Sequence, residues 1–531
     1  MLGLSYRSST FTQTLIEKYA YRSRTLATLR NIPLQNQFVN AYDVIILGGG
    51  VAGAALAASL VSSPLMKAKK IALVEAMDLS RVQQWTPTSG QYSNRVVSLT
   101  PASRTFLEDI GVWDRLFIDR IRPYTNMQVW DGISDARIEF DTSIFSKTHQ
   151  NVSEPPAIAY MAENVNLQYG IMKRIRAAQE SGQQFDIIDN TKVQRVFAQG
   201  KDGEKEDAID LSAWPSLELS NGQTISGQLL IGADGANSPV RAYADIQSLG
   251  WDYDRQGVVA TLQLDPATQN VTAWQRFLPT GPIAILPLDH GISSMVWTTT
   301  PAIAAALKSI PEQDFCALVN VAIRSNPADV QYLCQQIQKS EHGLDLQDEY
   351  SWRQMAQNES KTSEEIASRE DRLPPHVIGV QSGTRASFPL RLRNSERYVA
   401  DRIALVGDAA HTIHPLAGQG LNQGLRDVQV LSNVLTNGVK HGEDLGNIHL
   451  LSQYASNRYA RNLVMLSACD KIHRLYSTEF GPMVWARSLG LRGVNAFGYL
   501  KSEIMKYAMG IEDVKSKITP SRERFVNIDR L

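Results

Sequence analysis

The sequence predicts an α/β fold in which a Rossmann-like dinucleotide-binding domain is interleaved with a mixed or antiparallel β-sheet domain and followed by C-terminal helices. Three observations support this prediction. A β-branched run ends in a glycine-rich turn near residue 48, and a predicted strand late in the chain ends in Gly407-Asp408. Strand-like alternation fills much of the chain after residue 246. The 531 residues, 43% of them hydrophobic, suffice for more than one domain.

Composition narrows the possible partners and the compartment. The formal net charge is -1, and no dense run of lysine and arginine occurs in the body of the chain. A nucleic-acid partner is therefore not expected. Three cysteines without regular spacing fit a reducing compartment and argue against a structural zinc site or a disulfide framework.

The first 41 residues differ from the rest. They contain five arginines and lysines but one acid, Glu17, with serine and threonine throughout. A basic, hydroxyl-rich and acid-poor leader is typical of a mitochondrial transit peptide, which we expect over residues 1–41. The alternative is a disordered basic tail.

The glycine-rich turn follows a predicted strand over residues 42–47. Gly48, Gly50 and Gly53 form GxGxxG, and a helix of small residues comes next. The first glycine makes the turn, the second lets the backbone approach a pyrophosphate, and the third allows close helix packing. The uncharged run 44–66 is long enough to span a membrane, but three consecutive glycines favour a strand, a turn and a helix.

Two side chains after this turn are candidates for the nucleotide site. Glu75 follows a second predicted strand, where an acid would accept hydrogen bonds from the adenosine ribose. Arg95 stands before a helix predicted to begin near Thr100 with Pro101 at its first turn. We favour a cofactor role for Arg95 over an ordinary surface position.

The middle of the chain contributes a hairpin, a helix and a third loop. Strands are expected on both sides of a turn at Asp131-Gly132, and Glu163-Asn164 opens a helix to residue 179. A strand over 228–231 leads into GADG, where Asp234 precedes a short helix that begins at Ser238 and Pro239.

Residues 402–427 bring a carboxylate and a helix N-terminus together. A strand over 403–406 ends at Asp408, and a small-residue loop enters a helix around Gly420. Backbone amides at such a helix start hold anionic groups. His411 and His414 invite a metal or acid-base interpretation, but no third ligand lies at suitable spacing. We favour a structural role for His411 and keep His414, beside Pro415, as a candidate at the reaction space.

The three segments together resemble the fingerprints of the group A flavoprotein aromatic hydroxylases, the family of p-hydroxybenzoate hydroxylase. Within it, NRVVSLTPAS, VWDG and HPLAGQGLNQGLRD are similar to the ubiquinone-biosynthesis branch. The resemblance covers residues 42 to 510, which makes chance motif matching improbable.

The resemblance implies FAD as the cofactor. It assigns the pyrophosphate to the GxGxxG glycines, the adenosine ribose to Glu75, a bracing role to Asp234, a ribityl hydroxyl to Asp408, and the flavin pyrimidine to backbone amides at the helix start. The implied FAD-binding residues are Gly48, Gly50, Gly53, Glu75, Arg95, Asn164, Asp234, Asp408, Gly420, Leu421 and Asn422. Asn164 departs from relatives that often have arginine or glutamine there.

The resemblance also implies an activity. A flavin C4a-hydroperoxide formed from O2 would hydroxylate C5 of a polyprenyl-4-hydroxybenzoate-type ring in ubiquinone biosynthesis, at the matrix side of the mitochondrial inner membrane. Implied partners are ferredoxin and its reductase, a multiprotein coenzyme Q assembly and a peripheral membrane contact. Three alternatives stay open: an NADPH-dependent hydroxylase of a soluble phenol, a flavoprotein dehydrogenase, and a non-catalytic prenyl-binding protein on the flavin scaffold.

Domain limits follow from these segments. We expect a discontinuous FAD-binding domain over 42–124, 157–245 and 395–435, a substrate domain over 125–156 and 246–394, and a helical region over 436–531. Strands are expected over 246–330, and a polar surface insertion over 335–375. The apolar stripe over 480–510 favours core packing over a membrane interface. Side chains expected near the substrate pocket or behind it are Trp274, Arg276, Phe277, Leu286, Pro287 and Trp297.

Overall fold

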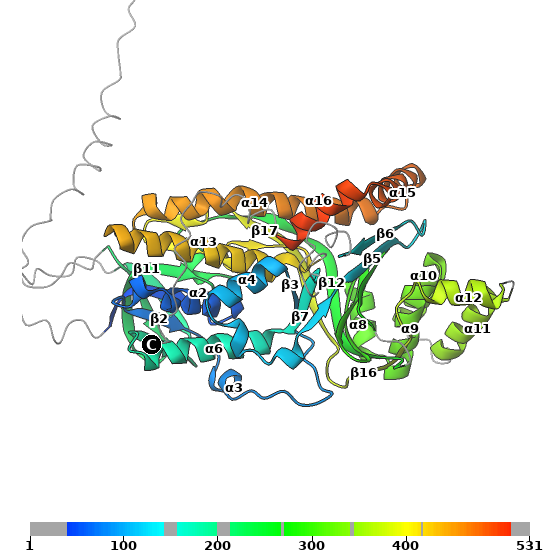
Figure 1. Cartoon of the computed structure of the whole chain (residues 1–531), viewed down its shortest axis with the longest axis horizontal. Helices are drawn as coiled ribbons and strands as arrows, with labels where there is room; N and C mark the ends of the chain where they lie inside the picture. The colour runs from blue at the N-terminus through cyan, green and yellow to red at the C-terminus, as the bar shows by residue number, and fades with distance from the viewer. Residues whose placement is uncertain are drawn as a thin grey trace, which may run out of the picture.

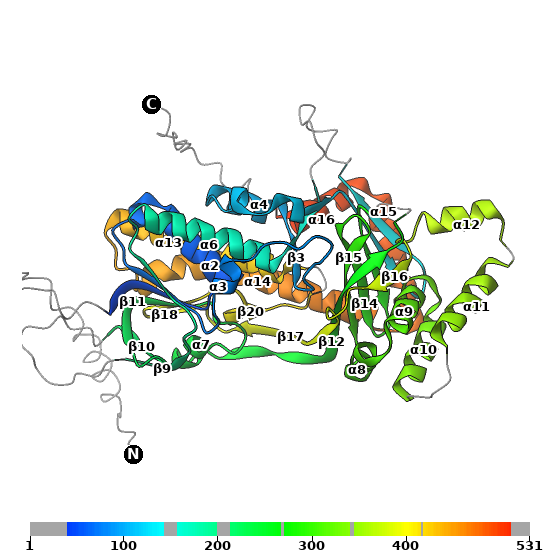
Figure 2. The ribbon, with the colours of Figure 1, turned by 90° about the horizontal axis from the view of Figure 1, so that it is seen from below.

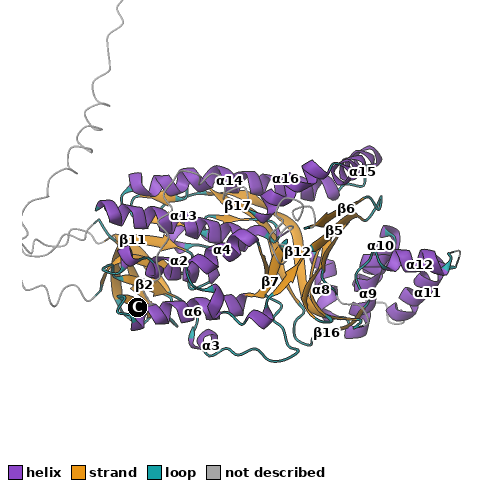
Figure 3. Cartoon of the chain, viewed as in Figure 1, coloured by secondary structure: helices purple, strands orange, loops and turns teal. Residues whose placement is uncertain are grey.

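The computed structural model describes residues 40–142, 157–198, 213–266, 270–339, 345–359, 361–415 and 418–510. All but the last two residues of the predicted transit peptide lie outside this part of the chain, as do residues 511–531 at the end of the predicted helical region. The fold is α/β, with helices packed around two large sheets (Figures 1 and 3).

The first large sheet has a parallel centre. Its strands run in the order β19-β11-β1-β2-β8, and each pairs in parallel with its neighbour. Antiparallel strands extend it, with β18 beside β19, and β10 and β9 beyond β11. The strands are β1 (Ala41–Leu47), β2 (Ile71–Val74), β8 (Phe185–Ile188), β9 (Val193–Ala198), β10 (Pro215–Leu219), β11 (Thr224–Gly232), β18 (Val399–Ala400) and β19 (Ile403–Leu405).

The central strands of this sheet read as apolar runs because helices cover the sheet. Figure 1 shows α2, α4, α6 and α13 stacked over it, and together they enclose the larger hydrophobic core. These helices are α2 (Val51–Ser62), α4 (Pro101–Asp109), α6 (Asn164–Glu180) and α13 (Gln419–His441); the short α3 (Ser80–Gln83) and α7 (Pro239–Tyr243) lie in loops. Thr100 and Ser238 cap α4 and α7, each followed by proline, as predicted.

The second large sheet is mostly antiparallel, as predicted. Its order is β20-β17-β12-β15-β14-β13-β5-β6, with β16 beside β12; only β13 and β5 pair in parallel. The long β12 and β17 run from the first half of the molecule into the second (Figure 2). The strands are β5 (Asn126–Asp131), β6 (Arg137–Asp141), β12 (Ser248–Leu264), β13 (Thr272–Leu278), β14 (Gly281–Asp289), β15 (Ile292–Thr299), β16 (Val377–Val380), β17 (Ala386–Ser395) and β20 (His411–Thr412).

A small sheet joins the two halves. It consists of β3 (Val96–Leu99), β7 (Ala159–Glu163) and β4 (Arg122–Tyr124), all antiparallel. It carries the loop of Arg95 on one side and the start of α6 on the other, so two predicted cofactor residues become neighbours. The amide of Asn164 donates to the carbonyl of Arg95 at 3.0 Å.

Two expectations for the second half were wrong. The run of consecutive strands from β12 to β15 ends at Thr299, and most of 301–324 forms helices. After Thr300, an N-cap with proline behind it, the apolar period changes from two to three or four. The polar insertion is also largely helical rather than a surface loop, since Asp345 and Thr362 cap helices of their own. The helices are α8 (Pro301–Ser309), α9 (Glu312–Arg324), α10 (Pro327–Lys339), α11 (Leu346–Asn358) and α12 (Ser363–Glu370).

Three C-terminal helices lie along one long side of the molecule, α14 (Ile448–Tyr476), α15 (Gly481–Ala496) and α16 (Gly498–Met509) (Figure 1). The buried pair of Asp131 and Arg487 fixes α15 to the β5–β6 hairpin, with nitrogen–oxygen distances of 2.9 and 3.0 Å. None of the described helices has the length and hydropathy needed to cross a bilayer. The exact domain limits stay a prediction.

Candidate functional site

Two glycines of the turn between β1 and α2 lie too close to neighbouring backbone for any side chain. Gly48 has φ +108°, and a Cβ there would lie 2.3 Å from the carbonyl oxygen of Ala233. A Cβ on Gly53 would lie 2.0 Å from the carbonyl oxygen of Gly48. Gly50 differs, because a Cβ there would meet nothing within 4 Å. The first and third glycines therefore serve close packing, while the second leaves the N-terminus of α2 open to a ligand.

Glu75 is fixed beside this turn. Its carboxylate accepts hydrogen bonds from the amides of Gly49 at 2.5 Å and Met77 at 2.8 Å. Gln168, on α6, donates to the carbonyl of Gly49 at 3.2 Å. The acid is thus held at the end of β2, where a ribose bound across the sheet edge would lie.

A second helix N-terminus approaches the first. Gly407, between β19 and the 3₁₀ turn that carries Asp408, has φ +59°, and a Cβ on it would touch that of Ala52 at 3.4 Å. A Cβ on Gly424 would lie 3.4 Å from Cα of Gly407, so α2, this turn and α13 are in close contact. The first-turn amides of α13 have no partner within the helix. They are available to an anionic group.

Two carboxyl groups near these helix starts have raised pKa values. Asp408 faces the cavity described below, and desolvation by the surrounding protein raises its pKa, against a smaller opposing effect of His411. Desolvation also raises the pKa of Asp234, whose Oδ2 accepts from the amide of Val240 at 3.2 Å. Asp234 therefore braces the turn into α7, and it is not among the residues that line the cavity.

The side chain of Asn422 has a role that the sequence did not suggest. Its Oδ1 accepts from the amide of Thr100 at 3.0 Å and the hydroxyl of Ser103 at 2.8 Å, and its Nδ2 donates to the carbonyl of Ser98 at 2.8 Å. Asn422 joins the start of α4 to α13 and is not part of the large cavity. Gly420 and Leu421, by contrast, line the cavity.

His411 is part of a buried polar network. Its Nε2 lies 2.5 Å from Oδ2 of Asp427, and Arg458 donates to the other carboxylate oxygen at 2.8 Å. These two partners outweigh desolvation and lower the pKa of Asp427 to about 2. The geometry agrees with the structural role favoured for His411.

A cavity of about 1590 Å³ connects the helix starts to the second sheet. Ligand pockets are usually about 300–1,000 Å³, so the space is ample for a large cofactor together with a second molecule. Arg95 and Asn164 lie on its wall, and the buried Oδ1 of Asn164 has no hydrogen-bond partner in the described structure. The predicted site residues on the wall are Gly50, Arg95, Asn164, Asp408, Pro415, Gly420 and Leu421.

The loop of residues 411–415 separates two candidates. Pro415 lines the cavity, but His414 does not, contrary to the expectation that it faces the reaction space. Its ring is fully buried, with centroids 5.0 Å from Tyr253 and 4.7 Å from His473. Desolvation, helped by His473, lowers the pKa of His414 to about 3. These two neighbouring side chains point in different directions, so Pro415 faces the cavity and His414 is buried in the protein core.

The substrate side of the cavity is largely apolar. Of the expected side chains, Phe277 and Leu286 lie on its wall, whereas Trp274 and Trp297 belong to the core behind it. Arg276 is buried and donates to the carbonyl of Ala322 at 2.9 Å. Residues missed in the sequence come from the hairpin and the C-terminal helices: Met127, Val129, Ile138, Phe140, Ile472, Leu475, Tyr476, Met483, Leu491, Val494 and Ile504. Only their amphipathic spacing could have indicated them.

These features fit a flavin dinucleotide. The open backbone at Gly50 lies at the start of α2, where a pyrophosphate would bind. The backbone amides at the start of α13 can bind a second anionic group. The carboxylates of Glu75 and Asp408 stand at different strand ends of one sheet, as the two ends of an extended dinucleotide require.

Comparison with known proteins agrees with this site. The family model for an FAD binding domain matches residues 41–350 and 313–467. The chain is 38% identical over 470 residues to the mitochondrial ubiquinone biosynthesis monooxygenase COQ6 of Xenopus tropicalis, covering 88% of this chain and 93% of that protein. It is 37% identical over 473 residues to COQ6 of Saccharomyces cerevisiae, covering 88% and 94%.

Solved structures share the fold. The p-nitrophenol 4-monooxygenase PnpA of Pseudomonas putida superimposes with a TM-score of 0.59 at 16% identity, covering 88% of this chain and 98% of that one. An HpxO variant from Klebsiella pneumoniae complexed with FAD has a TM-score of 0.57 at 15% identity, covering 88% and 98%. The chain therefore belongs to the FAD-dependent aromatic hydroxylases, in the branch of the ubiquinone biosynthesis monooxygenases, and it binds FAD as its cofactor.

Proposed function

We propose that this enzyme hydroxylates C5 of a polyprenyl-4-hydroxybenzoate-type intermediate with O2 and electrons delivered through FAD. The observation that supports the proposal is the continuous cavity. It begins at the helix starts that fit the flavin and continues between the second sheet and α14–α16, where its wall is apolar. A soluble phenol would need only the first part of this space. A polyprenyl chain would use the rest.

The residues of the chain have separable tasks. The bound flavin supplies oxygen activation when reduced, and the protein binds, orients and excludes water. Backbone amides of Gly420 and Leu421 would stabilise negative charge on the bound flavin, and the carboxylate of Asp408 would accept a hydrogen bond from its ribityl chain. The side chains of Phe277, Leu286 and Pro415 enclose the ring. Their apolar surfaces keep the reacting atoms dry.

The proposal includes a location and partners. The mitochondrial names of the relatives and the basic leader favour the mitochondrion, and the apolar end of the cavity suits a substrate drawn from the matrix side of the inner membrane. We propose ferredoxin and its reductase as the electron source, and a multiprotein coenzyme Q assembly as the setting. The location and the partners can be tested without measuring hydroxylation of the aromatic ring.

The decisive experiment supplies ¹⁸O2 to the flavin-loaded chain with reduced ferredoxin, and compares a prenylated 4-hydroxybenzoate with the unprenylated acid. Mass spectrometry should find one ¹⁸O atom at C5 of the prenylated ring and little product from the other. Equal turnover of the unprenylated acid with NADPH as donor would favour the soluble-phenol alternative. If the prenylated acid binds but no ¹⁸O is incorporated with either electron donor, the result would favour a dehydrogenase or a prenyl-binding protein.

A further inference from the structure

The second sheet presents a buried amide to the large cavity. Gln275, on β13, lines the cavity and is only 7% exposed. Its two chain neighbours belong to the opposite face of the sheet. Trp274 packs in the core behind the sheet, and Arg276 donates to the carbonyl of Ala322 on α9 at 2.9 Å. Because side chains alternate along a strand, the side chain of Gln275 points into the cavity.

The amide of Gln275 differs from its neighbours in having no protein partner. The indole of Trp274 donates to Oδ1 of Asn270 at 2.9 Å, so the polar atom of that side chain is satisfied. No group among the described residues forms a hydrogen bond with the side-chain amide of Gln275. A buried amide without a hydrogen bond is unfavourable and uncommon in folded proteins. A ligand in the cavity can supply the missing partner.

The wall around this amide is apolar. One row of residues crosses six paired strands, from β5 to β17, and lines the cavity. In order across the sheet, the row consists of Val129, Gln275, Ala284, Val296, Val259 and Ala386. The charged side chains among the described residues on the cavity wall lie outside this row: Arg95, Arg391, Asp408 and Arg487. A single neutral amide in an apolar wall fixes the orientation of a mostly apolar ligand.

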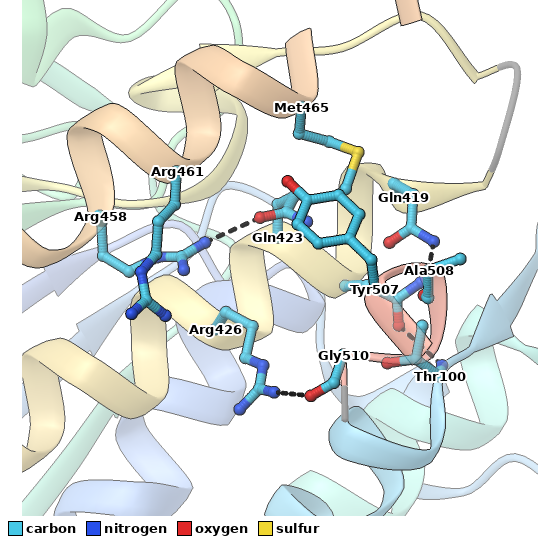
Figure 4. A pocket seen from close by; sticks show the side chains of 11 residues that line it. Thr100, Gln419, Gln423, Arg426, Arg458, Arg461, Met465, Tyr507, Ala508 and Gly510 are labelled. Carbon is cyan, nitrogen blue, oxygen red and sulfur yellow. Dashed lines mark hydrogen bonds between the residues drawn. The ribbon is translucent and has the colours of Figure 1, made fainter. Parts of the chain in front are cut away.

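A smaller cavity shows how polar side chains behave where they serve the protein itself. It measures about 330 Å³ and lies between α13, α14 and the end of α16 (Figure 4). Arg458 donates to Oε1 of Gln423 at 2.8 Å, and Arg426 donates to the carbonyl of Gly510 at 2.8 Å. These guanidinium groups bind protein oxygens and join the helices, whereas the amide of Gln275 joins nothing.

We propose that the amide of Gln275 forms a hydrogen bond with the phenol hydroxyl of the aromatic substrate and so positions the ring. This inference rests on the proposed function, because it takes a prenylated hydroxybenzoate as the ligand. A prenyl tail has no hydrogen-bonding group, so only the oxygens of the ring can satisfy the amide. A carboxylate would bring an unpaired charge to the apolar row, whereas a hydroxyl is neutral and can donate or accept.

Two anchors then determine which ring carbon is exposed to the flavin. The amide of Gln275 holds the hydroxyl, and the apolar side chains of α14–α16 hold the tail. In a ring prenylated beside its hydroxyl, these anchors occupy one side of the ring and leave the carbon on the other side of the hydroxyl, C5, free to react. Gln275 is therefore a positioning residue that fixes the site of hydroxylation.

The test is a titration of the flavin-loaded chain, followed by the flavin absorbance, with two ligands. One is a prenylated 4-hydroxybenzoate, and the other is the same molecule without its hydroxyl. Gln275→Met keeps the length of the side chain and removes the amide. It should lower the affinity for the first ligand about tenfold, as the loss of one hydrogen bond does, and leave the affinity for the second unchanged.

Gln128→Met is the matched control. Gln128 lies on the adjacent strand β5, where it pairs with Trp274, and it does not line the cavity. Its replacement should change the affinity for neither ligand. Unfolding in urea gives a second measurement. Because Gln275→Met removes a buried amide that lacks a partner, the denaturation midpoint should stay the same or rise.

Several results would overturn the proposal. Equal losses of affinity for the two ligands would mean that Gln275 only shapes the cavity, and a lower denaturation midpoint would give it a structural role. Loss of bound FAD in Gln275→Met would place the amide at the cofactor. If the wild type distinguishes the two ligands through Gln275 but incorporates no oxygen, the proposed hydroxylation fails and the positioning role stands. If the wild type binds neither ligand, both fail.

Discussion

The two halves of the large cavity are built in different ways. The flavin half depends on backbone: Gly48 and Gly407 let helix starts and strand ends come together, and Gly50 leaves the start of α2 open. The substrate half is made of side chains, brought from the β5–β6 hairpin, the second sheet and three C-terminal helices. A close backbone approach such as the one at Gly48 tolerates no added atom, whereas a side-chain wall can change size and still enclose a ligand.

The largest expected effect comes from the backbone half. Gly48→Ala places a Cβ 2.3 Å from the carbonyl oxygen of Ala233 and requires φ +108° from a residue that rarely adopts it. We expect protein without bound FAD, or insoluble protein. The flavin-to-protein absorbance ratio measures this.

Gly182→Ala separates the two causes. Gly182 also has a positive φ, +90°, but a Cβ there would meet nothing within 4 Å. This variant should lose only about 1–2 kcal/mol of stability and keep its flavin. If both variants retain FAD equally, the close approach at Gly48 is not needed for the site.

The second test removes the buried ion pair that attaches α15, a helix that lines the substrate half of the cavity, to the β5–β6 hairpin. Asp131→Asn keeps the shape of the side chain but leaves Arg487 buried without a counter-charge, and we expect about 3–5 kcal/mol less stability against urea. The pair of Arg137 and Asp135 offers the control, because the replaced carboxylate of Asp135 is 71% exposed and Asp135→Asn should cost at most about 1 kcal/mol. Equal effects of the two variants would show that α15 is not held by Asp131.

A third test concerns Asp408, an acid that lines the flavin end of the cavity. Asp408→Ala should weaken FAD binding roughly tenfold or more, since a hydrogen bond to a charged group contributes about 1.5–3 kcal/mol. Asp401, which precedes β19 at its other end and does not line the cavity, provides Asp401→Ala for comparison. Flavin fluorescence on titration of the apoprotein gives both dissociation constants. Equal constants would remove Asp408 from the cofactor site.

The smallest expected effect is the pH dependence of stability that is caused by His414. Burial lowers the pKa of His414 to about 3, below its ordinary value of about 6.5 in an unfolded chain. The unfolded state therefore binds the extra proton between these values, so this contribution to stability is complete above pH 6.5 and is lost as the pH falls, by up to about 1.4 kcal/mol per pH unit.

Replacing the imidazole should flatten this profile. His414→Gln should reduce the loss of stability between pH 6.5 and 5, a window chosen because most carboxylates titrate below it. His473 lies in the same cluster and also has a lowered pKa, so His473→Gln should act in the same direction. Parallel profiles for the wild type and His414→Gln would contradict the buried neutral state of His414.

The contrast between the halves also explains what the sequence could predict. The fold class and the helix starts near Thr100 and at Ser238 were predictable because each depends on a short motif with a local physical cause. The side chain of Asn422 was not, since its partners lie more than 300 positions away in the sequence. The helices after Thr299 were mistaken for strands because the preceding alternation was extended too far.

The substrate wall could be predicted only in outline. Phe277 and Leu286 were expected, but Leu491 was assigned to core packing and Tyr476 was not singled out. Amphipathic spacing shows that one face of a helix is covered, and it does not show whether protein or a ligand covers it. The same limit applies to the apolar stripe over 480–510, which was expected to pack into the core although Trp485 and Tyr499 are exposed.

The shared cavity is tested most directly by titrating the flavin-loaded chain with prenylated and unprenylated 4-hydroxybenzoate while recording the flavin absorbance spectrum. If the ring lies against the flavin and the tail along α14–α16, both ligands should perturb the flavin band, and the prenylated one should bind far more tightly, by about 0.8 kcal/mol for each buried methylene. Tight binding without a spectral change, or equal affinity for the two ligands, would contradict a single cavity that holds both.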